Sequence, residues 1–227
     1  MTEMQNRRPL KSRSAAWAQS LAKLLADGGA QADTISAASL AFAILGGAFL
    51  LWGGGDEGWT RAIAFLGAAG CIQLRLLCNL MDGLVAVENG QGSASGPIWN
   101  ELPDRFADVI LLACAGYGAA SGHMPGGAEL GWSCASLALI TAYVREFGRG
   151  FGFAPDFSGP MAKPQRMAAL TITALVSAIE GLWGWHGETM MVGLAVIGIG
   201  TAITLGRRVR TLARRLAERS GQEGDDA

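Results

Sequence analysis

ISAASLAFAILGGAFLLW, residues 35–52, runs without a single charged side chain. A helix needs about 20 mostly apolar residues to cross the hydrocarbon core of a bilayer, so this stretch is close to the length of a membrane span. Charged residues make up only 16% of the chain, whereas soluble domains have roughly 25%. Glycine is abundant, at 33 residues, which suits helices that pack closely in lipid. The sequence therefore predicts an all-α integral membrane protein.

Five further apolar stretches follow the first one. They cover residues 62–80, 108–120, 130–144, 167–185 and 189–205. Together the six stretches predict a bundle of six transmembrane helices over residues 34–206. The segment 1–33 precedes this bundle, and its residues 15–25 have the pattern of an amphipathic helix lying at the membrane surface. Residues 207–227 follow the bundle as a basic and then acidic tail.

The basic residues lie on one side of the expected bundle. Of the 18 Lys and Arg residues, all except Arg61 fall in the two terminal segments, near the end of the second span and start of the third, or between residues 145 and 166. Segments rich in Lys and Arg remain in the cytoplasm, so we expect a multi-pass protein, in a bacterial inner membrane, with both termini cytoplasmic. The net charge of −1 gives no reason to expect a nucleic-acid partner.

A polar stretch on this cytoplasmic side holds the best-marked candidate site. It reads NLMDGLVA over residues 79–86 and GPIWNELPDRFAD over residues 96–108. Helical periodicity places residues 79, 82 and 86 on one face, and likewise residues 100, 104 and 108. Two facing helix ends would bring their oxygen atoms together, and oxygen ligands suit a hard divalent ion such as Mg²⁺ or Mn²⁺. Gly83 and Gly96 would let the backbone approach a bulky ligand.

This stretch resembles the motif of the CDP-alcohol phosphatidyltransferases, D-x2-D-G-x2-A-R-x8-G-x3-D-x3-D. The chain keeps five of the motif residues at the same spacing: Asp82, Gly83, Ala86, Gly96 and Asp104. Three positions differ, because Asn79, Val87 and Asn100 replace an Asp, an Arg and an Asp. The start of the first span at residues 33–36 and the basic segment 145–163 are also similar to the family, so the resemblance covers roughly residues 33–205.

The resemblance implies a phospholipid-biosynthetic transferase. Such an enzyme moves a phosphatidyl group from a CDP-linked lipid to an alcohol acceptor and releases CMP, using Mg²⁺ or Mn²⁺ in a homodimer within the lipid membrane. Asp104 would be the general base, and the metal would be held by Asp82, Asn79, Asn100 and Asp104. The nucleotide would lie against Gly83, Ala86 and Gly96. Phosphate and acceptor would be bound by Arg145, Arg149, Lys163 and Arg166.

Other interpretations remain open at this point. The three departures from the motif are consistent with a non-catalytic membrane protein that binds lipid or nucleotide on the same scaffold. Asp82 and Asp104 could instead cap helices, and Asp108 could be a structural partner of Arg105 or Arg75. A transporter or channel is less favoured, because the ionisable residues gather at one face and do not mark a path through the spans.

Overall fold

The computed structural model describes residues 15–88 and 96–225, and every regular element in these two ranges is a helix. The prediction of an all-α fold is therefore confirmed. The elements are α1 (Ala16–Asp27), α2 (Ala32–Gly55), α3 (Gly58–Glu88), α4 (Gly96–Ser121), α5 (Gly127–Gly150), α6 (Lys163–Ser177), the short 3₁₀ helix η3 (Glu180–Trp183) and α7 (Glu188–Asp225).

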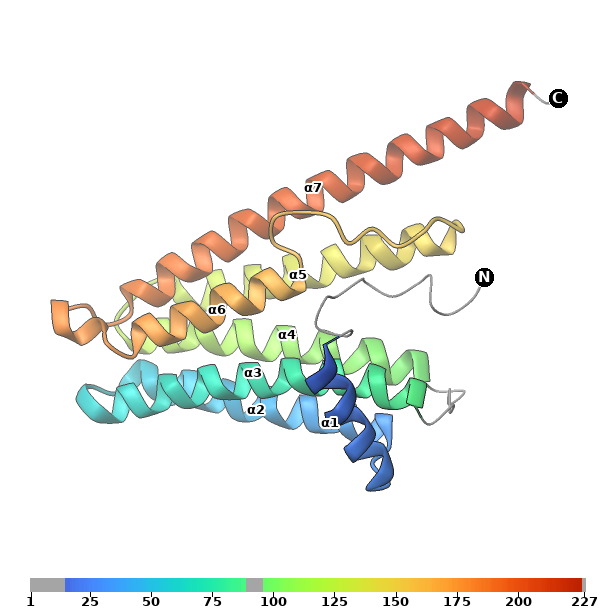
Figure 1. Cartoon of the computed structure of the whole chain (residues 1–227). Coiled ribbons are helices and arrows are strands. Elements are labelled where there is room, and N and C mark those ends of the chain that lie inside the picture. The colour runs from blue at the N-terminus through green and yellow to red at the C-terminus, as the bar shows by residue number, and fades with distance from the viewer. Residues whose placement is uncertain (1–14, 89–95, 226–227) are drawn as a thin grey trace.

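The long helices lie side by side in a bundle (Figure 1). α2 packs against α3 and α4, α4 packs against α5, and α5 packs against α7. α6 contacts both α3 and α7. The core between them is built from apolar side chains such as Leu111, Leu170 and Leu194, which are completely buried. This arrangement brings the ends of α3, α4, α5 and α6 close to one another.

Glycines allow the helices to approach at backbone distance. A Cβ added to Gly54 of α2 would lie only 2.0 Å from the carbonyl oxygen of Gly118 in α4. A Cβ added to Gly116 of α4 would lie 2.7 Å from the Cα of Gly131 in α5. No side chain fits at such contacts, so these glycines explain in part why the chain is so rich in this residue.

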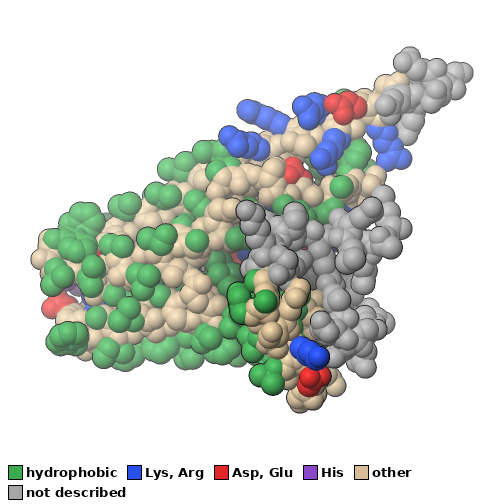
Figure 2. Space-filling view, in the orientation of Figure 1, with side chains coloured by type: hydrophobic (Ala, Val, Ile, Leu, Met, Phe, Trp, Pro, Cys, Tyr) green, Lys and Arg blue, Asp and Glu red, His purple; other side chains and the backbone are tan. Residues whose placement is uncertain are grey.

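Three of the described helices are long and apolar enough to cross a membrane, by their length and composition: residues Ala32–Gly55, Gly58–Ala86 and Glu188–Gly221. Large apolar side chains on the outside of the bundle are exposed, among them Ile63, Ile140 and Ile199, and Figure 2 shows apolar side chains over much of its surface. Lipid is the environment that such a surface requires. The chain is a membrane protein.

The helix bounds differ from the predicted spans at three places. α4 begins at Gly96 and not near residue 108, because the polar residues of the motif are themselves helical. The predicted fifth span, residues 167–185, is divided: α6 ends at Ser177, and η3 follows it. There Glu180 turns its completely buried side chain inward, and Gly184 ends η3 with φ 77°, a conformation that favours glycine.

The third difference is the tail. α7 does not end near residue 205 but continues to Asp225 as one helix that projects beyond the bundle (Figure 1). The sequence after Gly206 is rich in Arg, Leu and Ala, which are strong helix formers. Its Arg side chains gather on the projecting part (Figure 2). The basic tail is thus an extension of the last helix.

The predicted N-terminal helix is present as α1. Its small residues Ala18 and Ala22 are buried against Met81 and Val85 near the end of α3. α1 therefore packs against the part of α3 that carries the motif.

Candidate functional site

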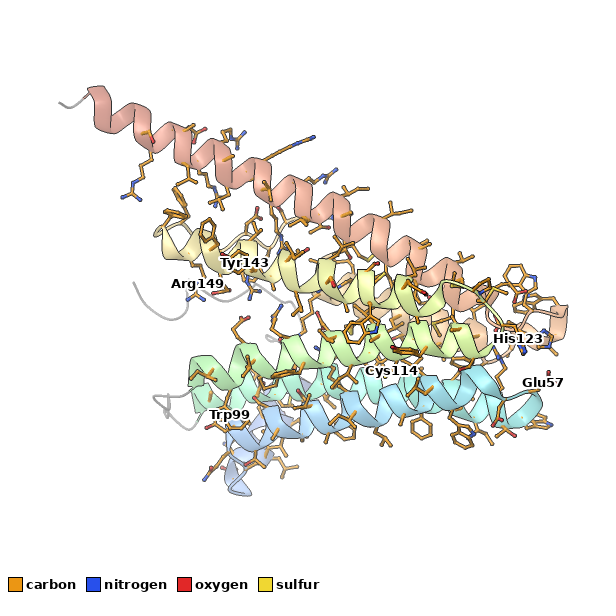
Figure 3. All side chains as sticks on the ribbon, turned by 180° about the vertical axis from the view of Figure 1, so that it is seen from behind. Glu57, Trp99, Cys114, His123, Tyr143 and Arg149 are labelled. Atoms are coloured by element: carbon orange, nitrogen blue, oxygen red, sulfur yellow. The ribbon has the colours of Figure 1, made fainter. Side chains whose placement is uncertain are left out.

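The motif residues lie at one end of the bundle. Figure 3 shows Trp99 and Arg149 toward this end and Glu57 and His123 at the opposite end. α3 contributes Asn79 and Asp82, α4 contributes Asp104 and Asp108, and α6 contributes Lys163 and Arg166. Residues of three helices thus converge on one small volume. We call the four residues Asn79, Asp82, Asp104 and Asp108 the acidic cluster.

Asp104 is the most contacted residue of the acidic cluster. Its Oδ1 accepts a hydrogen bond of 2.7 Å from Nδ2 of Asn79 and lies 3.3 Å from Nη2 of Arg75. Its Oδ2 accepts a hydrogen bond from the Lys163 ammonium. Residues of α3 and α6 therefore hold the Asp104 carboxylate from two sides, although 15% of the side chain stays exposed.

Asp82 lies deeper and has different partners. Its Oδ2 accepts a hydrogen bond of 2.8 Å from the Ser36 hydroxyl, which joins α3 to the start of α2. Asn79, one helical turn earlier on α3, donates a hydrogen bond to Asp104. The predicted shared face of residues 79 and 82 and its approach to Asp104 are thus present in the structure. Gly83 and Ala86 follow on the same helix and are half-buried.

Asp108 is the centre of a buried ionic group. Its Oδ1 accepts a hydrogen bond of 2.9 Å from Arg75, and its Oδ2 accepts one of 2.8 Å from Arg166. The Arg166 guanidinium also donates to the carbonyl of Met161, 3.2 Å away. All three charged side chains are almost completely buried. Asp108 therefore joins α3, α4 and α6 below Asp104, as the suggested partner of Arg75.

Arg75 is the residue of this site whose role the sequence did not reveal. A single Arg near the end of an apolar span is usually a side chain that extends toward the head groups. Arg75, however, is completely buried and contacts both Asp104 and Asp108. The available signal was its spacing, because residue 75 lies four positions before residue 79 and so shares its helix face.

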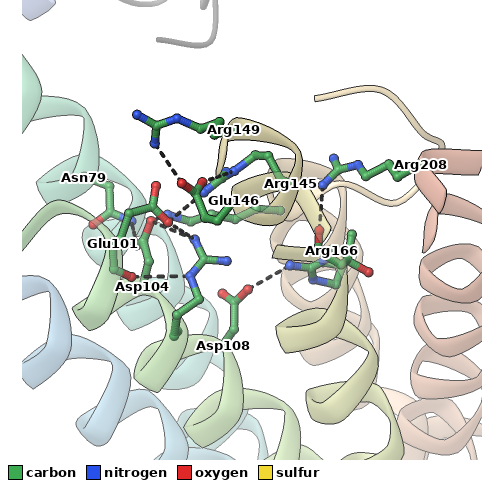
Figure 4. A network of polar contacts seen from close by, with 12 residues as sticks. Asn79, Glu101, Asp104, Asp108, Arg145, Glu146, Arg149, Arg166 and Arg208 are labelled. Atoms are coloured by element: carbon green, nitrogen blue, oxygen red, sulfur yellow. Dashed lines mark hydrogen bonds and ion pairs between the residues drawn. The ribbon is translucent and has the colours of Figure 1, made fainter. Parts of the chain in front are cut away.

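A second network lies nearer the surface (Figure 4). Glu101 of α4 accepts a hydrogen bond of 2.6 Å from Nη2 of Arg145 in α5, and it also contacts Arg105. Glu146 pairs with Arg145 at 2.8 Å and with Arg149 at 2.7 Å. Arg145 and Arg149 are thus close to the acidic cluster, but carboxylates of their own chain hold them. Lys163 and Arg166, by contrast, contact the acidic cluster directly: Lys163 donates to Asp104 and Arg166 to Asp108.

The donor atoms of the acidic cluster determine whether a metal ion fits. Among the described residues, no group of three or more His, Cys, Asp and Glu side chains could hold a metal ion. Asp82 and Asp104 offer carboxylate oxygens, the type that a hard divalent ion prefers. Both Asp104 oxygens, however, already accept hydrogen bonds, from the Asn79 amide NH₂ group and from Lys163, so a metal ion at Asp104 would have to displace these donors. The side chains at positions 87, 96 and 100 lie outside the described part of the structure.

The chain is similar to known proteins in sequence and in fold. No family model matches the chain. Two curated relatives are phosphatidylinositol phosphate synthases, each 24% identical to the chain. The protein from Mycolicibacterium smegmatis aligns over 85% of this chain and 82% of its own length. The protein from Streptomyces avermitilis aligns over 84% and 75%.

Solved structures of a phosphatidylinositol phosphate synthase, PgsA1 of Mycobacterium tuberculosis, share the fold. The structure with CDP-DAG bound has a TM-score of 0.71 at 18% identity and covers 87% of this chain and 94% of that one. The structure in complex with manganese and citrate has a TM-score of 0.70 at 19% identity and covers 86% and 88%. The resemblance of this chain to the CDP-alcohol phosphatidyltransferase family, predicted from the spacing of its motif, is thereby confirmed.

Proposed function

We propose that the protein is a divalent-metal-dependent transferase of phospholipid biosynthesis. It moves a phosphatidyl group from a CDP-linked lipid to an alcohol acceptor and releases CMP. The observation that carries this proposal is the position of Asp104, a carboxylate at the motif spacing that is partly exposed and held between α3 and α6. The two curated relatives, both phosphatidylinositol phosphate synthases, support the same reaction class.

In the proposed reaction Asp104 acts as the general base. The acceptor oxygen forms a bond to the lipid-side phosphorus of the CDP-linked donor, and the bond from that phosphorus to the CMP oxygen breaks. The hydroxyl proton passes to a carboxylate oxygen of Asp104 and then to water. Asn79 and Lys163 keep the carboxylate in position for this transfer.

The metal would be Mg²⁺ or Mn²⁺, held by Asp82, Asn79, Asn100 and Asp104. When bound, it would neutralise the diphosphate of the donor and so assist departure of CMP. A structural relative crystallised with manganese supports this choice.

The remaining site residues are assigned by their places around the cluster. Gly83 and Ala86 on α3, with Gly96 opening α4, would border the nucleotide. The substrate phosphates would be bound by Arg145, Arg149, Lys163 and Arg166. For Arg145 this binding includes an exchange of partners, because it must leave Glu101 to contact a phosphate.

We further propose that the bundle spans the membrane six times, with residues 1–33 and 207–227 in the cytoplasm. α4, α5 and α6 also carry exposed apolar side chains, such as Tyr117, Ile140 and Ile172. Arg61, the one basic residue assigned to the opposite side, is buried and paired with Glu180, so it does not oppose this orientation. A homodimer is the assembly that the family resemblance implies.

A non-catalytic lipid- or nucleotide-binding role is the second candidate. One observation favours it: side chains of the same chain already contact both oxygens of the Asp104 carboxylate. In this role the acidic cluster would stabilise the bundle, and the substrates would bind without reacting.

An acceptor panel separates the two candidates. Purified protein in nanodiscs receives CDP-diacylglycerol, Mg²⁺ or Mn²⁺, and glycerol 3-phosphate, inositol, inositol phosphate or serine, and CMP is measured. The transferase predicts CMP release that requires one acceptor and the metal. Binding of CDP-diacylglycerol without CMP release, with every metal and acceptor, would establish the non-catalytic role instead.

A further inference from the structure

The loop between α5 and α6 leads directly into two residues of the site. It comprises residues 151–162, has turns but no helix or strand, and ends where Lys163 begins α6. Lys163 donates a hydrogen bond to Asp104, and Arg166 donates one to Asp108. The path of this loop therefore decides where both cations lie. Because it has no regular structure of its own, contacts with its neighbours must hold it in one conformation.

The projecting part of α7 supplies such contacts. Three of its arginines donate hydrogen bonds to backbone carbonyls of the loop: Arg208 to Ser158 at 3.1 Å, Arg215 to Ala154 at 3.2 Å and Arg219 to Phe151 at 3.0 Å. The arginines are seven and four positions apart, so they share one face of α7 and span about 16 Å of its axis. Loop residue numbers fall as arginine numbers rise, so the loop runs antiparallel to the helix (Figure 1).

A fourth contact fixes the end of the loop that is nearest the site. The backbone N–H of Met161 donates to the hydroxyl of the buried Thr204, 2.9 Å away, and Thr204 lies one turn before Arg208 on α7. Gly159 has a φ of 123°, and a Cβ added there would overlap the Thr204 side chain, so this close approach requires glycine. The Met161 carbonyl accepts a hydrogen bond of 3.2 Å from Arg166. Met161 thus connects α7 to a cation of the site.

The preference for positive charge in the cytoplasm does not explain these contacts. Arg207 and Arg210 belong to the same segment and are exposed, and they satisfy that preference equally well. Arg208, Arg215 and Arg219 differ from them because their guanidinium groups reach the backbone of another segment.

We propose that this face of α7, formed by Thr204, Arg208, Arg215 and Arg219 and called the loop-binding face below, positions the α5–α6 loop and through it Lys163. Arg215 and Arg219 are positioning residues, because they act on the site through the loop. The inference rests on the proposed function for the role of Lys163 in binding a substrate phosphate.

Hydrogen exchange tests the step from α7 to the loop. Full-length Arg215→Gln/Arg219→Gln protein is compared with the wild type in nanodiscs. We expect the amides of residues 151–162 to exchange about tenfold faster, because two hydrogen bonds that hold the loop are lost. Arg207→Gln/Arg210→Gln removes the same charge from the exposed face and should exchange like the wild type. Equal loop exchange in the wild type and Arg215→Gln/Arg219→Gln would overturn the inference. If that variant does not fold, Arg219→Gln alone is measured in the same way.

Binding of CDP-diacylglycerol tests the step from the loop to Lys163. The dissociation constant is measured in the same nanodiscs without an acceptor. Arg215→Gln/Arg219→Gln should weaken binding about fivefold and should add nothing to the effect of Lys163→Gln, because both changes disturb the same contact. Unchanged affinity, or the same weakening with and without Lys163, would reject a role that acts through Lys163.

These measurements separate the inference from the proposed function. If the loop and binding results are as expected but the wild type releases no CMP with any acceptor, the loop-binding face is supported and the transferase is contradicted. If the wild type releases CMP and Arg215→Gln/Arg219→Gln leaves kcat, KM and loop exchange unchanged, the transferase is supported and the role of the loop-binding face is rejected.

Discussion

Buried ionic groups lie at both ends of the bundle, and they are built differently. At the end opposite the motif, Arg61 of α3 pairs with Glu180 and donates to the carbonyls of Ser177 and Gly53, each at 3.2 Å. Glu180 in turn accepts a hydrogen bond of 3.1 Å from the backbone of Thr189. We call this group the Arg61–Glu180 pair. One cation matches one anion, and the residues of the group lie at the ends of α2, α3, α6 and α7 and in η3.

The acidic cluster has more charges, fewer satisfied donors and one partly exposed carboxylate. Arg75 and Arg166 both retain buried N–H groups without partners in the described residues. At the opposite end no atom of the Arg61 or Glu180 side chains belongs to that set, although the hydroxyls of the neighbouring Ser177 and Thr189 do. Asp104 reaches the surface, and Glu180 does not. We interpret the Arg61–Glu180 pair as structural, because both of its charged side chains are buried, and the acidic cluster as the functional end, because one of its carboxylates is partly exposed.

The largest expected effect is on turnover at the acidic cluster. Asp104→Asn keeps the size of the side chain, but its NH₂ group cannot accept the hydroxyl proton, nor the hydrogen bond that Asn79 or Lys163 donates to the carboxylate. We expect CMP release per folded molecule to fall by about 10³-fold, with a separate loss of stability that thermal unfolding measures. If Asp104→Asn released CMP as fast as the wild type, the acidic cluster would not be the site of catalysis, and its contrast with the Arg61–Glu180 pair would have no functional meaning.

The next effect is on stability at the Arg61–Glu180 pair. Glu180→Gln leaves the Arg61 charge buried without its partner, which should lower the free energy of unfolding by about 3 kcal/mol. Unfolding in detergent, followed by circular dichroism, measures this loss. Glu57→Gln, an exposed carboxylate at the same end, is the matched control and should change stability little. Equal stability of the two variants would show that the buried pair is not structural.

A smaller effect is expected at the network of Arg145 and Glu101. If Arg145 leaves Glu101 to bind a substrate phosphate, Arg145→Gln should raise KM by about tenfold and change kcat less. Steady-state kinetics with varied CDP-diacylglycerol and acceptor measure both constants. Arg214→Gln, which removes an exposed charge that pairs with Glu218 in the same helix, should leave them unchanged. A fall in kcat alone would place Arg145 outside phosphate binding.

The smallest effect concerns the loop between α5 and α6. Burial of the Asp156 carboxyl raises its pKa, but hydrogen bonds from Ser158 and the charges of Arg208 and Arg215 outweigh burial and hold this pKa below its usual value. The folded state therefore gains stability above the ordinary pKa of about 3.9 and loses it as the pH falls through the folded pKa. Asp156→Asn should cost about 1 kcal/mol at neutral pH and little in acid. A difference that grew in acid would contradict this assignment.

The sequence predicted the parts of the fold that follow from uniform composition. An uninterrupted apolar run such as residues 35–52 has few structural choices in a membrane, so α2 could be predicted closely. Glu180 and the glycines after it divide the predicted fifth span, because a charged side chain turned inward requires a partner that only the folded bundle supplies. The tail after Gly206 is polar, and only its helix propensity indicated that α7 would continue.

In the candidate site, too, only the features that a local sequence pattern determines could be predicted. Asn79, Asp82 and Asp104 could be predicted to converge, because their spacing fixes the helix faces they share. Arg75 could not, since its contacts with Asp104 and Asp108 depend on how α3 and α4 are placed relative to each other, each packed against α2. The pairing of Arg145 with Glu101 likewise joins two helices whose relative position no local pattern determines.

One comparison tests the central claim most directly: CMP release from CDP-diacylglycerol, per folded molecule, by the wild type, Asp104→Asn and Glu180→Gln in nanodiscs. With the acceptor and metal that support turnover, we predict an active wild type, an Asp104→Asn variant that is folded but inactive, and a less stable Glu180→Gln variant that retains activity. Equal activity of the wild type and Asp104→Asn, or a folded but inactive Glu180→Gln variant, would contradict the assignment of function to the acidic cluster.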